Sequence, residues 1–243
     1  MYAIKTEKLT KKYKDKTVVD NLDLKINCGE VYALLGVNGA GKTTTIKLLS
    51  CLVKPTAGKA WLMGKSIADD ETEVKQLISI SPQETSVAPN LTVRENLEFI
   101  AGIFGFSRKE AKKKADKMIK DFNMAEIEKS RAKTLSGGWQ RRLSIAMSLI
   151  SQPKVLFLDE PTLGLDVFAR RELWRLIDSL KGSITVILTT HYLEEAEALS
   201  DRIGIMSKGV LKAQGSAQEL KKKAGTESFE EAFVKLAESE VQL

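Results

Sequence analysis

The segment GVNGAGKTT at residues 36–44 constrains the fold of this chain more than any other stretch. It contains the pattern GxxxxGK followed by Thr, in which glycines let several backbone amides converge on phosphate oxygens. A short apolar run at residues 31–35 precedes it, and apolar side chains at near-helical spacing follow it between Thr44 and Leu52. Strand, loop and helix together favour a phosphate-binding loop over a glycine-rich turn that binds nothing. Its residues are Gly36, Val37, Asn38, Gly39, Ala40, Gly41, Lys42, Thr43 and Thr44.

Two side chains of this loop have roles that the pattern predicts. Lys42 can reach the β- and γ-phosphates of a nucleotide, and Thr43 can hold a magnesium ion. The N-terminus of the following helix contributes its dipole to the same anion. The loop therefore predicts a nucleotide site in an α/β fold.

Length and composition limit the remaining possibilities. The 243 residues suit one α/β domain or a core with a subdomain. No run approaches the ~18 apolar residues of a membrane span, and the first residues lack the apolar stretch of a secretory signal. Cys28 and Cys51 have no framework spacing, so we expect a cytosolic, reduced chain. The net charge of +6 permits contact with anionic lipid or nucleic acid, but the dispersed Lys residues favour a solvated surface.

The first part of the chain has the pattern of an antiparallel β flank. Leu22, Leu24 and Ile26 alternate with polar residues, as one wet and one buried sheet face require. Tyr13 lies in a turn-like stretch between two strand candidates, where its ring can stack on an adenine base, although simple packing also explains it. Further strand candidates are residues 59–63 and 77–80, and Gln83 follows the second.

A helical insertion is predicted at residues 91–133. Its two amphipathic helices carry capping boxes, Thr92 with Glu95 and Ser107 with Glu110. The linker at residues 84–90 can act as a hinge. The apolar positions of the two faces are Val93, Leu97, Ile100, Ala101 and Phe104, and then Ala111, Ala115, Met118, Ile119 and Phe122.

The last third alternates strand and helix patterns, which favours a largely parallel sheet. Its apolar runs are residues 155–158, 184–188 and 203–206. Two further capping-box candidates, Ser216 with Glu219 and Ser228 with Glu231, predict short helices in a tail at residues 216–243. We therefore expect a catalytic core at residues 1–90 plus 134–215, and a helical subdomain that extends through a helix to about residue 150.

Polar residues follow four of the apolar runs, at the point where each predicted strand ends. They are Gly36, Gln83, the pair Asp159 and Glu160, and His191. The carboxyl ends of parallel strands share one edge of a sheet, and ligands bind there. The sequence therefore predicts that these side chains face the same phosphate group.

The chemistry of these side chains suits phosphoryl transfer. Asp159 can hold magnesium, although an aspartate that caps a helix is the alternative. Glu160 adds a carboxylate that can accept a proton from an attacking water. His191, the only histidine, can donate to a γ-phosphate oxygen, although alone it is also consistent with a structural role.

The segment Leu135–Gly138, LSGG, predicts a second anion-binding helix terminus. A bound nucleotide has one γ-phosphate, and the chain already has one phosphate loop. The second terminus therefore suits the nucleotide of a partner, and two copies placed head to tail would close two sites.

At these residues the sequence resembles the ATP-binding cassette (ABC) family of ATPases, whose motifs occur here in order over nearly the whole chain. The resemblance implies an α/β P-loop NTPase fold with a RecA-like, mostly parallel core, an antiparallel β flank and an inserted helical subdomain in a single domain. It also implies ATP and Mg²⁺ as ligands. Residues 36–44 resemble the Walker A loop, and Tyr13 the adenine-stacking aromatic.

The resemblance extends to the remaining motif residues. Gln83 is similar to the residue that senses magnesium and water, Asp159 to the Walker B magnesium partner, Glu160 to the catalytic base and His191 to the switch histidine. Magnesium would thus contact Thr43, Gln83 and Asp159. Ser136, Gly137 and Gly138 resemble the signature that acts in trans, and Asp166, in the LGLD segment, the D-loop residue that crosses the dimer interface. One departure is Trp139, where the family often has Gln.

The resemblance implies an ATP-hydrolysing subunit of an ABC transporter, on the cytoplasmic face of the cell membrane. It would dimerise with itself or a homologous subunit and drive transport, in the direction of export, through separate transmembrane permease subunits docked near Gln83 and the helical subdomain. No nucleic acid partner is expected. Residues 81–83, 90–97 and 104–105 are most similar to the drug, antibiotic or polysaccharide exporter branch (ABC-2 type).

Two alternatives have less support. A soluble cassette ATPase that acts on nucleic acid, ribosomes or cluster assembly would resemble members with long coiled coils or two fused cassettes, and neither feature is present. A small-molecule kinase or GTPase lacks LSGG with a strand-end Asp-Glu pair, and the guanine motif NKxD is absent.

Overall fold

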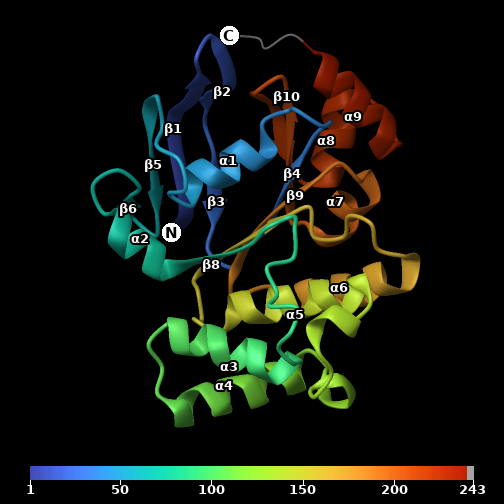
Figure 1. Cartoon of the computed structure of the whole chain (residues 1–243). Coiled ribbons are helices and arrows are strands. Elements are labelled where there is room, and N and C mark those ends of the chain that lie inside the picture. Colours follow the sequence, from blue (N-terminus) through green and yellow to red (C-terminus); the bar gives the residue numbers. More distant parts are fainter. Residues whose placement is uncertain (240–243) are drawn as a thin grey trace.

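Six strands form the central, largely parallel sheet of the computed structural model, which describes residues 1–239 (Figure 1). The spatial order is β11-β10-β4-β9-β8-β7, and only β11 runs antiparallel to its neighbour. The strands are β4 (Val31–Leu35), β7 (Ile78–Ser81), β8 (Val155–Asp159), β9 (Thr185–Thr190), β10 (Arg202–Ser207) and β11 (Val210–Gly215). Every residue of β4, β8 and β9 is buried, as expected of parallel strands covered on both faces.

The predicted antiparallel flank is present as a second sheet. It contains β1 (Tyr2–Tyr13), β2 (Lys16–Leu22), β3 (Lys25–Asn27), β5 (Ala57–Leu62) and β6 (Lys65–Ser66). Leu22, Leu24 and Ile26 are at most 1% exposed, whereas the residues between them are exposed. These side chains share one hydrophobic cluster with Leu34 of the central sheet and Leu48. The flank is therefore packed against the sheet that carries the phosphate loop.

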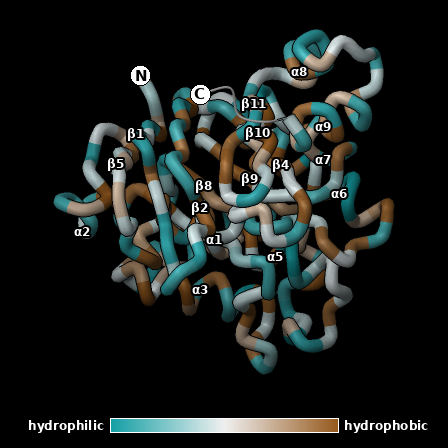
Figure 2. Tube along the Cα trace, turned by 90° about the horizontal axis from the view of Figure 1, so that it is seen from above, coloured by the Kyte–Doolittle hydropathy of each residue, from teal (hydrophilic) through white to brown (hydrophobic). Residues whose placement is uncertain are grey.

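The helices of the described part cover both faces of the central sheet and form the lower end of the molecule (Figure 1). They are α1 (Lys42–Leu49), α2 (Glu71–Leu77), α3 (Val93–Ile103), α4 (Arg108–Asp121), α5 (Gly137–Leu149), α6 (Val167–Asp178), α7 (Leu193–Leu199), α8 (Ala217–Ala224) and α9 (Phe229–Glu238), with short 3₁₀ turns at Ala125–Ile127 and Ala132–Thr134. Seen from above, hydrophobic stretches of β4, β9 and β10 lie in the interior (Figure 2).

Two helix ends differ from the sequence prediction, and one helix was not predicted. The helix after the phosphate loop ends at Leu49, because Cys51 has a left-handed φ of 59°, and Leu52 is 60% exposed. Phe104, predicted on the buried face of its helix, is the C-cap residue of α3 and is 46% exposed. The helix α2 was not predicted because Val74 is its only buried residue, so its sequence shows no helical stripe.

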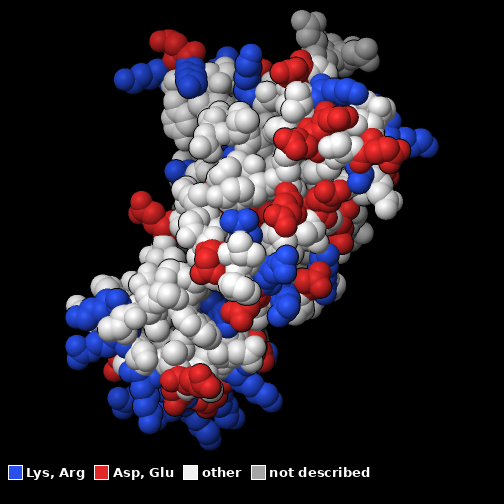
Figure 3. Space-filling view, turned by 90° about the vertical axis from the view of Figure 1, so that its right-hand side faces the viewer, with Lys and Arg blue, Asp and Glu red and all other residues white. Residues whose placement is uncertain are grey.

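The predicted helix starts of the insertion are confirmed. Thr92 with Glu95, and Ser107 with Glu110, form complete capping boxes before α3 and α4. The buried faces of the two helices pack in the same core cluster as α5. Lys and Arg side chains gather at this lower end of the molecule in Figure 3, where Figure 1 places α4. Part of the positive charge is therefore concentrated rather than dispersed.

The C-terminal tail forms the two predicted helices. Ser216 with Glu219 is a complete capping box. Ser228 accepts from the Glu231 amide as predicted, but the Glu231 carboxylate accepts from the Thr226 hydroxyl instead. Residues 240–243 of the expected tail lie outside the described residues. Within residues 1–239, no helix combines the length and apolar character needed to cross a bilayer.

Candidate functional site

Four strands of the central sheet end side by side. The register pairs Leu35 with Thr190 and Asp159 with Thr189, and Ser81 lies opposite Leu158. The residues that follow these ends therefore meet at one edge of the sheet, as the order of polar residues in the sequence predicts. The edge contains Gly36, Gln83, Asp159, Glu160 and His191.

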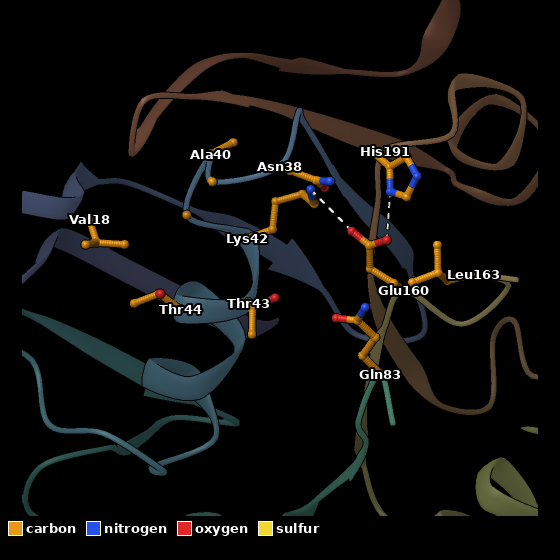
Figure 4. Close-up of a pocket in the computed structure, with 12 residues that line it drawn as sticks. Val18, Asn38, Ala40, Lys42, Thr43, Thr44, Gln83, Glu160, Leu163 and His191 are labelled. Atoms are coloured by element: carbon orange, nitrogen blue, oxygen red, sulfur yellow. Dashed lines mark ion pairs between the residues drawn. The ribbon is translucent and has the colours of Figure 1, made fainter. Parts of the chain in front are cut away.

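A pocket of about 480 Å³ opens at this edge (Figure 4). Most of the phosphate loop lines it, together with three strand-end residues. The lining residues are Val18, Asn38, Gly39, Ala40, Gly41, Lys42, Thr43, Thr44, Gln83, Glu160, Leu163 and His191. Val18 was not predicted, because nothing in its local sequence indicates a site, and Leu163, the first residue of the LGLD segment, was not predicted to line the pocket of its own chain.

The loop has the backbone geometry of a cradle. Gly41 has a φ of 104°, and a Cβ there would lie 2.6 Å from the carbonyl oxygen of Val18. A Cβ on Gly36 would lie 2.4 Å from the Met206 carbonyl oxygen. Only glycine therefore fits these two positions. Helix α1 begins directly after Gly41 with no side-chain cap and no acidic residue in its first turn, which leaves its N-terminal amides for an anion.

Lys42 is held across the mouth of the loop. Its ammonium donates to the carbonyl oxygens of Gly36 at 2.7 Å and Val37 at 3.3 Å. The same nitrogen lies 3.4 Å from Glu160 Oε1, and Lys42 is 5% exposed. The structure therefore places a buried cation beside the cradle. Gly36 and Val37 contribute these carbonyls and do not line the pocket.

Glu160 stands between the Lys42 ammonium and the His191 ring. Its Oε1 faces Lys42, and its Oε2 lies 2.7 Å from Nδ1 of His191 (Figure 4). The backbone of Glu160 has a φ of 47°, which is uncommon for a residue with a side chain. Its amide donates to the carbonyl and the hydroxyl oxygens of Thr189, at 3.1 and 3.0 Å. The turn after β8 therefore projects this carboxylate into the pocket.

The oxygen atoms beside the cradle suit a magnesium ion. Thr43 Oγ1 donates to Asp159 Oδ1 at 3.1 Å, and that carboxylate oxygen also accepts from the Thr189 hydroxyl. Asp159 is the last residue of β8 and does not cap a helix. In Figure 4 the Gln83 side chain enters the space between Thr43 and Glu160. Hydroxyl, carboxylate and amide oxygens are the ligands that Mg²⁺ prefers, so these residues fit the ion.

The described residues contain no group of three or more His, Cys, Asp or Glu that could enclose a metal ion.

A buried carboxylate supports the site from behind. Glu195 of α7 is 0% exposed and accepts from Nε1 of Trp174 at 3.3 Å. Burial raises the pKa of Glu195, against the lowering effect of the neighbouring Thr190 and Thr162 side chains. These threonines belong to the segments that carry His191 and Glu160. The sequence alone did not indicate Glu195, because an acidic residue near the start of a helix is typical of an exposed position.

The predicted signature lies outside the pocket. Ser136 is the N-cap of α5 without a side-chain cap hydrogen bond, and Ser136 and Gly137 are exposed. A Cβ on Gly137 would meet open space, whereas one on Gly138 would lie 2.9 Å from Cβ of Ala169. Gly138 therefore permits the close packing of α5 on α6. None of the three residues lines the pocket of its own chain.

Two other predicted residues have structural contacts of their own. Asp166 caps α6, and its Oδ1 accepts from the amides of Phe168 and Ala169 at 2.9 and 3.0 Å. Tyr13 ends β1, is 45% exposed and does not line the pocket, with Lys11 Nζ 5.0 Å from its ring centroid.

The departure at Trp139 has a local explanation. The Arg142 guanidinium lies 4.2 Å from the centroid of the Trp139 ring and pairs with Glu172 of α6. The neighbouring Gln140 donates to the carbonyls of Ala132 and Leu135, at 3.1 and 3.3 Å. Trp139 thus packs within its own chain and leaves the exposed Ser136 terminus uncovered.

Comparison with known proteins agrees with this geometry. A family model described as ABC transporter matches residues 19–163. The human phospholipid-transporting ATPase ABCA3 is 41% identical over 92% of this chain, which spans 13% of that protein. The daunorubicin resistance ATP-binding protein DrrA3 of Streptomyces coeruleorubidus is 41% identical over 92% of this chain and 71% of its own length.

A solved structure extends the likeness to three dimensions. It is the dimeric, post-hydrolysis state of the ATP-binding cassette MJ0796 bound to ADP and Pi. It aligns with a TM-score of 0.78 and 28% identity, over 88% of this chain and 98% of that one.

Proposed function

The chain belongs to the ABC transporter family as an ATP-hydrolysing member, and we propose that it drives export through separate membrane subunits by ATP-dependent head-to-tail dimerisation. The proposal rests on the observation that one chain provides only part of the nucleotide site. One chain contains a complete phosphate cradle with a buried carboxylate, whereas its Ser136 terminus is exposed and does not line the pocket at that cradle.

Within one chain, the pocket residues have distinct tasks. The amides of residues 38–44 and Lys42 bind the phosphates, and Tyr13 stacks on the adenine base. Thr43, Asp159 and Gln83 would hold Mg²⁺, which supplies neutralisation of phosphate charge when it is bound.

Hydrolysis then depends on the two remaining side chains. Glu160 accepts a proton from water as the water oxygen bonds to the γ-phosphorus, and the bond from that phosphorus to the bridging oxygen breaks. His191 orients Glu160 through the 2.7 Å contact and donates to the γ-phosphate as charge develops. The products are ADP and inorganic phosphate.

The partner supplies what the single chain lacks. The exposed Ser136 hydroxyl and the first amides of α5 form an anion-binding helix terminus that would close over the γ-phosphate of the second copy. Asp166 would lie at the same interface. The dimeric state of the solved relative supports this arrangement, and the partner is a second copy or a homologous subunit.

The membrane partner would dock beside the helical insertion. Phe99 and Ile103 of α3 are 55% and 62% exposed. Apolar side chains at such exposure are typical of a protein-binding surface when they cluster. The names of two relatives, a phospholipid-transporting ATPase and a daunorubicin resistance protein, support an amphiphilic cargo. With its partner in the membrane, the chain would lie peripherally at the cytoplasmic face.

Purification from detergent-solubilised membranes of the native host tests this function. The tagged full chain should copurify with an integral membrane protein, and its ATP hydrolysis should stop when EDTA removes Mg²⁺. The double variant Phe99→Ser/Ile103→Ser should lose the membrane protein, whereas Val234→Ser, which changes a 47% exposed side chain on α9, should retain it. Copurification with nucleic acid or ribosomes alone would contradict the transporter assignment.

A further inference from the structure

One arginine of α5, the helix that follows Ser136, contacts the sheet edge that carries the predicted catalytic residues. Arg141 lies on α5, four residues after the Gly137 start, and is 4% exposed. Its Nη2 donates to the carbonyl oxygen of Asp159 at 2.7 Å, and its Nε donates to that of Pro161 at 2.8 Å. Its Nη1 donates to the carbonyls of Pro82 and Gln83, the latter at 3.2 Å. One guanidinium therefore joins the turns after β7 and β8.

The partners of Arg141 are all main-chain oxygens. Among the described residues, no carboxylate lies within ion-pair distance of Arg141. Burial lowers the pKa of Arg141 to about 10, so the group is still charged near neutral pH. A buried charge is costly unless its hydrogen bonds are satisfied. The four carbonyl contacts are therefore what keeps this guanidinium in place.

The contacts with Asp159 and Pro161 bracket Glu160. Arg141 holds the peptide group before Glu160 through the Asp159 carbonyl and the peptide group after Pro161 through the Pro161 carbonyl, and the Glu160 amide is held by Thr189. A left-handed backbone conformation is strained at a residue with a side chain, so it persists only when surrounding contacts hold it in place. Arg141 supplies one constraint directly before Glu160, where φ is 47°, and a second one residue after it.

We propose that Arg141 is a positioning residue for ATP hydrolysis, which holds Glu160 and Gln83 in their working orientation and ties them to the helix that begins at Ser136. The proposal rests on the function proposed above, in which Glu160 is the base. The proposal adds a connection between the two sites of the dimer. Helix α5, which would bind the partner's nucleotide at its N-terminus, also holds the turn that carries Glu160 in its own chain. Neither the sequence motifs nor the relatives' names assign this role.

The variant Arg141→Lys tests the link directly. Lysine keeps the charge, but its compact ammonium cannot reach carbonyls in both turns, as the planar guanidinium does. A misplaced catalytic group can cost about 100-fold, so we expect kcat to fall about 10- to 100-fold. The Kd for ATP should change less than about twofold, because Arg141 does not line the pocket. An unchanged kcat would overturn the proposal.

A matched control is Arg202→Lys. Arg202 also donates to a main-chain carbonyl, that of Lys25 at 2.9 Å, but it lies at the start of β10, on the opposite edge of the sheet. Its replacement should leave kcat unchanged. A fall equal to that of Arg141→Lys would indicate a general structural effect and would also overturn the proposal.

The double variant Arg141→Lys/Glu160→Gln separates positioning from general damage. If Arg141 acts mainly through Glu160, its replacement should lower the residual turnover of Glu160→Gln by a smaller factor than it lowers that of the wild type, because one of the two groups it positions is already lost. Fully additive losses would contradict this role.

Hydrogen exchange provides a readout that does not need ATP hydrolysis. In Arg141→Lys the amide of Glu160 should exchange at least about 10-fold faster, while amides of β4 keep their rates. Unchanged exchange at Glu160, uniform acceleration or failure to fold would overturn the proposal. An inactive wild-type chain would refute the proposed function alone, so the two failures are distinguishable.

Discussion

The two halves of the proposed nucleotide site differ in how completely one chain provides them. The cradle side consists of the phosphate loop and the strand-end residues around it. Its Lys42 and Glu160 are 5% and 8% exposed, and each has neighbours within 3.4 Å. The signature side consists of residues 136–138 at the start of α5. Here Ser136 has no side-chain cap hydrogen bond, and both Ser136 and Gly137 are exposed. Contacts within the chain hold Lys42 and Glu160 in place, whereas the hydrogen-bond donors of Ser136 and Gly137 are exposed at the surface. This difference is what a site shared between two chains requires.

Removing the carboxylate of the cradle side gives the largest expected effect. Glu160→Gln should slow ATP hydrolysis by about 100-fold or more, because the amide cannot accept the proton of the attacking water. Binding of ATP should persist. The measurement is steady-state phosphate release together with the Kd for ATP. The control is Glu194→Gln, an exposed carboxylate on α7. Wild-type turnover in Glu160→Gln would refute its role as the base.

Tyr13 tests whether the cradle side extends to the adenine base. Stacking of a base on an aromatic ring contributes about 1–3 kcal/mol, so Tyr13→Ala should weaken ATP binding about 5-fold or more. Tyr2→Ala is a matched control, because Tyr2 is also 45% exposed on β1 and also has a lysine, Lys25, near its ring. Equal ATP affinity in both variants would remove Tyr13 from the site.

The smallest effect concerns the buried support of the cradle. Because burial raises the pKa of Glu195, the folded chain holds a proton that the unfolded chain has lost, over the interval between the two pKa values. The contribution of Glu195 to stability should therefore decrease as pH rises through that interval. Glu195→Gln removes this titration.

Urea unfolding at several pH values measures the effect. Relative to wild type, Glu195→Gln should gain unfolding free energy as pH rises, whereas Glu197→Gln, at an exposed site on the same helix, should show no such trend. A stability difference between wild type and Glu195→Gln that does not vary with pH would contradict the buried, proton-holding state.

The sequence predicted most of the cradle side, because its signals are local. Buried parallel strands are continuous apolar runs, so the residues after them, such as Gln83 and His191, could be placed at one edge. Capping boxes located helix starts equally well. Strand β11 was not predicted, because its alternation of polar and apolar residues is interrupted by a register shift against β10.

The residues that the sequence did not reveal depend on tertiary packing. Arg141 and Glu195 are charged residues on helices, which local patterns assign to the surface, yet they are 4% and 0% exposed. Val18 lines the pocket only because β2 of the flank passes beside Gly41. The roles of Ser136 and Asp166 in trans stay predictions, since they concern a second chain.

The most direct test of the shared site is ATP-dependent dimerisation of Glu160→Gln with and without Ser136→Arg, measured by size-exclusion chromatography with light scattering. Glu160→Gln alone should form dimers with ATP and monomers without it. Adding Ser136→Arg should leave monomers that still bind ATP, because the new side chain blocks the exposed helix terminus. Ser183→Arg, the same change at an exposed position before β9, should leave dimerisation intact. Dimers of undiminished stability in Glu160→Gln/Ser136→Arg would contradict the account.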